Sequence, residues 1–156
     1  MKKINWNNLL IIVLTTELIG MLGNLFSGNP RQSYTTFIKP PLSPPGWLFG
    51  VVWPLLYLLM GLGAYLIYQT PPTLERKKAT TLYWVQLFVN LLWPIVFFSF
   101  EWYWISVIII LLLDVLVLFT LLRFYKIDKA AGYLMIPYLL WLLFATYLNI
   151  GIALLN

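Results

Sequence analysis

The chain has 156 residues, of which 62% are hydrophobic, 18% aromatic and only 10% charged, and its mean hydropathy is +0.85. A soluble domain carries about 25% charged residues, so this composition excludes a water-soluble fold and indicates that lipid forms part of its surroundings. The chain has no Cys and no His, which excludes a disulfide framework and a thiolate metal site and removes the commonest metal ligand. The net charge of +5 comes from short basic clusters between apolar runs, a pattern typical of membrane-flanking loops and not of nucleic-acid binding.

Apolar runs long enough to cross a membrane recur along the chain. A helix rises about 1.5 Å per residue, so about 20 apolar residues cross a hydrocarbon core of roughly 30 Å. Short polar segments separate the runs, and none of them is long enough for a second domain. The sequence therefore predicts a single-domain, all-α membrane protein, a bundle of five transmembrane helices at residues 6–26, 46–68, 80–99, 103–123 and 132–154.

The first run, residues 6–26, follows two lysines and superficially fits a cleavable signal. It carries Glu17 and has no clean small-residue cleavage site, because SGNP at 27–30 places a proline immediately beyond it. We therefore expect a retained first helix.

The segment before the second run, residues 27–45, is rich in proline. Proline fixes φ near −65° and biases the preceding residue toward extended conformations, so we expect a stiff approach to the second helix. Pro45 is tolerable in the first turn of that helix, where its missing N–H would be unpaired anyway. Two interpretations remain open. The prolines shape the wall of a cavity, or they only start a helix, which explains Pro40 and Pro41 less well.

Three of the predicted helices carry a face that mixes Trp with amide, phenol or small groups. The spacings i, i+4 and i+7 or i+8 place each set on one helix face. Such faces could be explained by amides that hydrogen bond between helices and by Trp in the interfacial belt. The belt alone is a sufficient explanation for Trp102 and Trp104, which lie at a tight turn. For Trp residues well inside their spans we favour a pocket. The three sets are Trp53, Tyr57 and Gly61; Gln86, Asn90, Trp93 and Phe97; and Trp141, Ala145 and Asn149.

Two carboxylates, Glu17 and Asp114, fall near the middle of the first and fourth runs, and no Lys or Arg lies at that depth. A lone carboxylate there must find a partner or bind a proton. A proton relay is one interpretation. We favour a hydrogen bond to a hydroxyl or amide of a neighbouring helix.

The distribution of basic residues predicts the orientation. On one side of the bundle lie Arg31 and Lys39, and on the other lie Lys2, Lys3, Arg76, Lys77, Lys78, Arg123, Lys126 and Lys129. Because basic residues concentrate in cytoplasmic loops, we expect the N-terminus in the cytoplasm and the C-terminus outside.

A flat-walled aromatic pocket with a few uncharged polar groups suits a large planar apolar ligand. Haem would normally need an axial His, Cys or Met. Because this chain has no His and no Cys, stacking and burial are the expected sources of affinity, and a metal-free porphyrin should bind about as well as haem.

Four segments follow one another in a specific order: TELIG at 16–20, KPPLSPPGWLFGVVWPLLYLLMG at 39–61, QLFVNLLWPIVFF at 86–98 and PYLLWLLFATYLN at 137–149. In this order the chain resembles, over nearly its whole length, the TspO/MBR family of tryptophan-rich sensory proteins related to the mitochondrial translocator protein. The resemblance implies a five-helix bundle, usually a homodimer, whose cavity opens toward the long first loop.

The resemblance also implies ligands and site residues. Family members bind porphyrins, haem and synthetic isoquinoline or benzodiazepine ligands, with no required cofactor and no metal site. The ligand-binding positions would be Trp53, Asn90, Trp93, Tyr138, Trp141, Ala145 and Leu148. The lid of the cavity would be the loop at 27–45, with Tyr34, Lys39, Pro40, Pro44 and Pro45. Some bacterial relatives degrade protoporphyrin under light, and the two tryptophans implicated there resemble Trp53 and Trp141.

Three functions from different classes stay open at this point: a sensor or regulator of tetrapyrrole or stress metabolism, a light-dependent enzyme that consumes protoporphyrin, and a porphyrin transporter. Transport usually leaves repeats or broken helices, and the sequence shows none. The proposed cholesterol pattern needs a base after Tyr147, and LNIGIALLN contains none, which argues against strong sterol binding. Short loops and a Lys/Ile/Asn-rich composition point to a bacterial cytoplasmic membrane.

Overall fold

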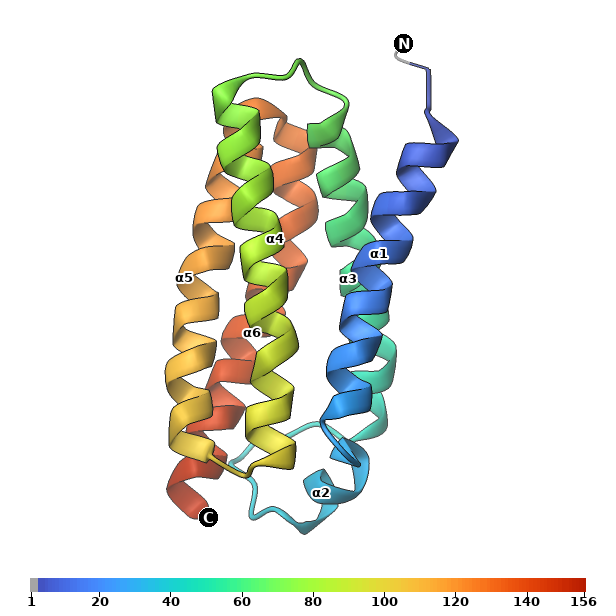
Figure 1. Ribbon diagram of the computed structural model, residues 1–156. Coiled ribbons are helices and arrows are strands. Elements are labelled where there is room, and N and C mark those ends of the chain that lie inside the picture. Colours follow the sequence, from blue (N-terminus) through green and yellow to red (C-terminus); the bar gives the residue numbers. More distant parts are fainter. Residues whose placement is uncertain (1–2) are drawn as a thin grey trace.

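The computed structural model describes residues 3–156, and all of its regular structure is helical (Figure 1). Lys2, one of the basic residues that predict the orientation, lies outside the described residues. The elements in chain order are α1 (Trp6–Phe26), α2 (Pro30–Thr36), α3 (Trp47–Tyr68), α4 (Leu74–Pro94), the π-helix η1 (Ile95–Ser99), α5 (Tyr103–Ile127) and α6 (Lys129–Leu155). Figure 1 shows the long helices side by side in one bundle, with short α2 at the end where the chain finishes.

Five helices are long and apolar enough to cross a membrane, which confirms the predicted number: α1, α3, α4 together with η1, α5 and α6. The predicted bounds were too short where polar turns continue a helix beyond its apolar part. The third span starts at Leu74 and not at 80, because the Thr73 side chain accepts the Arg76 N–H as an N-cap. The last helix starts at Lys129 and not at 132, because Asp128 accepts the Ala131 N–H in the same way.

The loop predicted at 27–45 contains a helix, α2, that the sequence interpretation missed. Asn29 caps it by accepting the Gln32 N–H over 3.3 Å, and Pro30 occupies the first turn, where no N–H is needed. The sequence Asn-Pro therefore starts a helix here. The start of α3 also differs from expectation. This helix begins at Trp47, so Pro45 precedes the first turn, and its carbonyl accepts the Leu48 N–H.

Helices α1 and α3 meet closely at two glycines. A Cβ on Gly20 would lie 2.2 Å from Cε2 of Tyr57, and one on Gly61 would lie 3.0 Å from Cα of Val13. Small residues let membrane helices approach in this way, so these two glycines pack two helices of the same chain against each other. The contact fixes the middle of α1 against α3, and the cavity described below begins at this level.

The remaining outer surface is apolar, as lipid contact requires. Helix α1 exposes Leu14, Leu18 and Leu25, and α5 exposes Ile108 and Leu112. Trp102 and Trp104 at the turn into α5 are about half exposed, at 55% and 56%, which agrees with a place in the interfacial belt.

Candidate functional site

A cavity of about 560 Å³ opens at the α2 end of the bundle. Helices α1, α2, α3, α4, η1 and α6 all contribute to its walls. Five of the seven residues predicted for ligand binding line it: Trp53, Asn90, Trp93, Ala145 and Leu148. Residues from three helices that are distant in sequence thus share one space, as the polar and aromatic faces predicted.

Aromatic rings form one continuous wall of the cavity. Trp53 stacks on Tyr57, with ring centroids 5.6 Å apart and planes 27° apart. Trp93 stacks on Phe97 at 5.7 Å and 22°, and the Trp53 and Trp93 centroids lie 6.4 Å apart. Large rings of this kind present broad, stiff apolar surface, so the wall suits a flat ligand.

Phe97 comes from η1, the π-helix that directly follows Pro94. Single π-helical turns in longer helices are frequent at functional sites. Here this turn supplies both Phe97 and Phe98 to the cavity wall.

Asn90 joins the cavity to a buried polar network below it. Its Oδ1 accepts a hydrogen bond from the Tyr57 hydroxyl over 2.7 Å, and its Nδ2 donates to the Tyr138 hydroxyl over 2.7 Å. The Tyr138 hydroxyl in turn donates to Oε1 of Gln86 over 3.0 Å. Both ends of the Asn90 amide are therefore held, and its orientation on the cavity wall is fixed.

Trp93 is held in a similar way from the other side. Its indole N–H donates to Oδ1 of Asn149 over 2.7 Å, and Nδ2 of Asn149 donates to Oγ of Ser106 over 3.0 Å. Asn149 is almost fully buried and itself lines the cavity. Side chains from α4, α6 and α5 thus lock the plane of the Trp93 ring.

The other two predicted binding residues, Tyr138 and Trp141, are not on the cavity wall. Tyr138 is fully buried beneath Asn90. Trp141 packs edge-on against Phe49, with centroids 5.8 Å apart, and Phe49 is the residue that lines the cavity. The Trp141 indole N–H is buried, and it has no hydrogen-bond partner within the described chain.

Among the predicted lid residues, Tyr34 alone lines the cavity. Its hydroxyl donates to the Pro44 carbonyl over 2.7 Å, and burial raises its pKa above the usual 10.0. Lys39 lies 4.9 Å from the centre of the Tyr34 ring, and its Nζ donates to the Tyr34 carbonyl. These contacts hold Tyr34 from behind.

The loop is also tied to the C-terminal part of α6. Pro40 packs so closely on Gly151 that a Cβ there would lie 2.5 Å from its Cγ. The Tyr147 hydroxyl donates to the Pro41 carbonyl over 2.7 Å. Pro45 accepts the Leu48 N–H and so joins the loop to α3. Apart from Tyr34, the predicted lid residues therefore do not line the cavity. Their contacts hold the loop in place beside it.

The two mid-span carboxylates behave differently from each other. Asp114 accepts a hydrogen bond from Oγ1 of Thr146 over 2.8 Å, which confirms the expected hydroxyl partner on a neighbouring helix. Glu17 lies on the cavity wall, and no hydrogen bond or ion pair within residues 3–156 satisfies it. The expected partner for Glu17 is therefore not present in the described chain.

Helix α1 supplies the part of the wall that the predicted site omitted. Glu17, Gly20, Met21 and Asn24 line the cavity at i, i+3, i+4 and i+7, the spacing of one helix face. That periodic face, with two polar residues, a glycine and a methionine, was visible in the sequence. The same wall includes Arg31, from α2. Residues 3–156 contain no group of three or more acidic side chains that could hold a metal ion.

The sequence pattern of the TspO/MBR family matches residues 11–155, which is nearly the whole chain. The chain belongs to the TspO/MBR family. It is therefore an integral membrane protein of the tryptophan-rich sensory and translocator group.

Relatives in this family come from distant organisms. The chain is 38% identical to the "Tryptophan-rich protein TspO" of Archaeoglobus fulgidus, over 92% of this chain and 94% of the relative. It is 36% identical to the protein of the same name from Chlorobaculum tepidum, over 88% and 89% of the two chains. The human "Translocator protein" is 32% identical, over 92% and 87%. The similarity thus extends over all five spans.

Proposed function

We propose that this TspO/MBR protein binds porphyrins, haem-like tetrapyrroles and isoquinoline-type ligands in the cavity, and that it acts as a sensor or regulator of tetrapyrrole or stress metabolism. The observation that carries the proposal is the aromatic wall formed by Trp53, Tyr57, Trp93 and Phe97. The volume of the cavity, about 560 Å³, is in the range of roughly 300–1,000 Å³ that is typical of small-molecule sites. Ala145 and Leu148 add apolar surface, and Asn90 adds a fixed amide.

The source of affinity in this proposal is stacking and burial. The chain has no His or Cys to ligate iron, so a metal-free porphyrin binds about as well as haem. No resident cofactor is required. The ligand itself is the flat apolar molecule that the protein recognises.

The loop at 27–45 acts as a lid in this proposal. Its helix α2 begins at Pro30 and, through Tyr34, reaches the cavity wall. Lys39, Pro40, Pro44 and Pro45 keep the loop in place through the contacts described above. A stiff lid leaves less conformational freedom to be lost on binding, which favours affinity.

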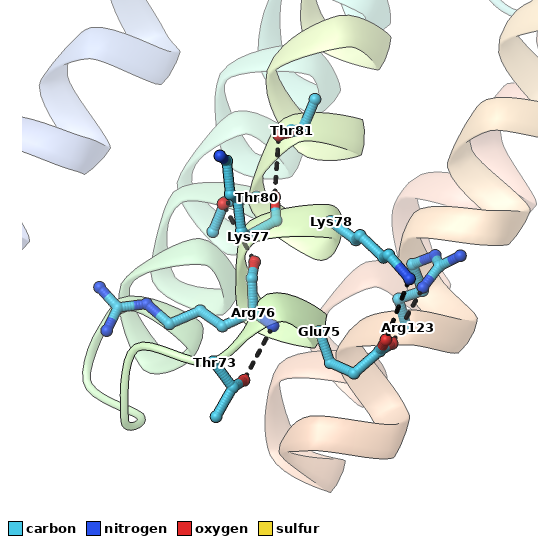
Figure 2. A network of polar contacts seen from close by, with 8 residues as sticks. All are labelled: Thr73, Glu75, Arg76, Lys77, Lys78, Thr80, Thr81 and Arg123. Atoms are coloured by element: carbon cyan, nitrogen blue, oxygen red, sulfur yellow. Dashed lines mark hydrogen bonds and ion pairs between the residues drawn. The ribbon is translucent and has the colours of Figure 1, made fainter.

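We also propose that the N-terminus is cytoplasmic, that the C-terminus is outside and that the protein works as a homodimer in a bacterial cytoplasmic membrane. Basic residues support the orientation. Figure 2 shows one cluster of them at the start of α4, where Glu75 pairs with Lys78 at 3.3 Å and with Arg123 at 3.1 Å. Arg31, in contrast, lies in α2 at the other end of the bundle, just after the last residue of α1. Basic clusters of this kind favour the cytoplasmic side.

Light-dependent degradation of protoporphyrin is the second candidate, and Trp53 on the cavity wall is the observation that favours it. An excited porphyrin supplies the reactivity, and the protein has only to hold it beside an oxidisable ring. Trp141 lies behind Phe49, so its part would be indirect. We expect Trp141→Phe to slow bleaching and largely to spare binding. Equal bleaching by free porphyrin in detergent would defeat this candidate.

The proposed binding is tested by titrating the purified protein with metal-free protoporphyrin in the dark and following tryptophan fluorescence. We expect saturable quenching that Trp93→Leu weakens and Trp102→Leu leaves unchanged, because Trp102 lies outside the cavity. Equal effects of the two substitutions would count against binding in this cavity. Illumination of the same samples then tests the second candidate.

A further inference from the structure

Glu17 is a carboxylate on the cavity wall that the described residues leave without a partner. The ion pairs within residues 3–156 both use Glu75 at the far end of the bundle. Asp114, at a similar depth on α5, has its hydroxyl partner in Thr146. A carboxylate inside the span of a membrane is costly unless it is paired, so the position of Glu17 calls for a partner from outside the described chain.

Two hydroxyl groups beside this part of α1, those of Thr16 and Tyr57, are already engaged in buried hydrogen bonds and would lose them by turning to Glu17. The Tyr57 hydroxyl already donates to Asn90 over 2.7 Å. One residue before Glu17, the Thr16 hydroxyl is bonded to the Tyr83 hydroxyl over 2.6 Å. Leaving such a buried group unpaired costs about 1–3 kcal/mol, so these bonds persist.

Glu17 lies halfway along α1, between its buried and its lipid-facing residues. Gly20 on one flank is buried, and Leu18 on the other is 55% exposed. The carboxylate therefore borders both the cavity and the edge of α1, where a ligand in the cavity can reach it.

The loop end of the same wall carries the opposite charge. Arg31 lines the cavity from α2, and no acidic side chain within the described residues pairs with it. Phe26, the last residue of α1, lies nine positions after Glu17, which is about 14 Å along a helix. The cavity thus has an acidic group at depth, a basic group near its loop end and an aromatic wall supplied by α3, α4 and η1.

We infer that Glu17 and Arg31 select the ligand by charge: the cavity prefers a planar ligand that offers an N–H donor or a cationic nitrogen to Glu17 and an acidic group to Arg31. This inference rests on the proposed function and narrows its ligand class. A nitrogen donor at Glu17 makes a charge-assisted hydrogen bond, the stronger kind, in a poorly solvated place. A neutral flat hydrocarbon fits the same walls and leaves both charges unpaired.

Three probes that share one ring system test the inference: 1-pyrenebutylamine, 1-pyrenebutanol and 1-pyrenebutyrate. Energy transfer from tryptophan to pyrene, in one non-ionic detergent, gives the affinity of each probe. We expect Glu17→Gln to weaken the amine about tenfold and to leave the alcohol within about twofold. Glu17→Asp, which keeps the charge, retains the preference for the amine. Arg31→Gln weakens the butyrate about threefold, since Arg31 is more exposed.

Matched controls come from charged residues away from the cavity. Asp114→Asn and Arg123→Gln each remove one charge, and we expect neither to change the ratios between probes. Alcohol binding serves as the check that each variant is folded. An amine-to-alcohol ratio that is the same in the wild type and in Glu17→Gln overturns the inference and leaves the proposed cavity standing. The absence of saturable energy transfer to any of the three probes counts against both the inference and the proposed cavity.

Discussion

The indole N–H of Trp93 on α4 donates to Oδ1 of Asn149 on α6, and the two atoms are 2.7 Å apart. Because Asn149 is held by Ser106 of α5, three helices set the plane of one cavity ring. The aromatic wall is therefore organised before any ligand arrives. Such preorganisation lowers the entropy that binding must overcome.

Asn149→Leu tests this relationship. The substitution removes the acceptor of the Trp93 indole N–H and leaves that donor unsatisfied, whereas the Ser106 hydroxyl keeps its hydrogen bond to the Tyr103 carbonyl. We expect a loss of about 1–3 kcal/mol in stability and weaker porphyrin binding. Thermal unfolding and dark titration measure the two effects. Ser106→Ala leaves the Trp93 bond intact and should cost less, and an equal cost would contradict this ordering.

Gly20→Ala should disturb the cavity from α1. The added Cβ would lie 2.2 Å from Cε2 of Tyr57, so the ring must move and its bond to Asn90 is strained. Overpacking of this kind costs about 1–3 kcal/mol, and ligand affinity should fall with it. Unfolding in detergent and titration measure both.

Gly50→Ala is the matched control, because nothing lies within 4 Å of its added Cβ although Gly50 lines the same cavity. Replacing an interior helical glycine by alanine favours the helix by about 0.5–1 kcal/mol. We therefore expect unchanged or slightly higher stability. A loss as large as that of Gly20→Ala would refute the packing argument.

Asp114→Asn should leave ligand affinity within about twofold of the wild type, since an amide oxygen can still accept the Thr146 hydrogen bond and Asp114 is not on the cavity wall. Titration with metal-free protoporphyrin measures this. A large loss of affinity would revive the proton-relay interpretation of this carboxylate.

Tyr34→Phe should loosen the loop. It removes the hydrogen bond to the Pro44 carbonyl and keeps the ring beside Phe49, with centroids 5.1 Å apart in the wild type. We expect faster ligand release with little change in unfolding temperature, measured by stopped-flow fluorescence. An unchanged release rate would show that this bond does not hold the loop over the cavity.

The same hydroxyl predicts a pH dependence. Burial raises the folded-state pKa of Tyr34 above 10.0, so its contribution to stability is fully present below pH 10.0 and is lost as the pH rises through the raised pKa. In Tyr34→Phe this alkaline loss should be smaller. Release rates and unfolding measured between pH 8 and 11 in both proteins give the comparison.

Particular residues explain how far the sequence could predict the structure. Apolar runs predicted the five spans, because a membrane helix must satisfy its own backbone and bury an apolar length. Spacing on single helix faces predicted that Trp53, Asn90, Trp93 and Ala145 meet at one cavity. These are properties of one helix at a time, which a sequence displays directly.

Relations between helices were harder to predict. Whether Trp141 or Phe49 occupies the wall depends on the rotation of α6 against α3, which no single-helix pattern specifies. The sequence prediction lacks helix α2 because the prolines predict a stiff loop, whereas Pro30 after the Asn29 cap occupies the first turn of a helix. The position of Glu17 on the cavity wall was not predicted, because it depends on the tight α1–α3 contact at Gly20.

Filling the cavity with a larger side chain tests the proposed ligand binding most directly. Ala145 lies on its wall and is almost fully buried, whereas Leu143, two residues earlier on α6, is about half exposed on the outer surface. Ala145→Phe should abolish saturable quenching by metal-free protoporphyrin, and Leu143→Phe should leave the titration unchanged. Wild-type affinity in a folded Ala145→Phe protein would contradict binding in this cavity.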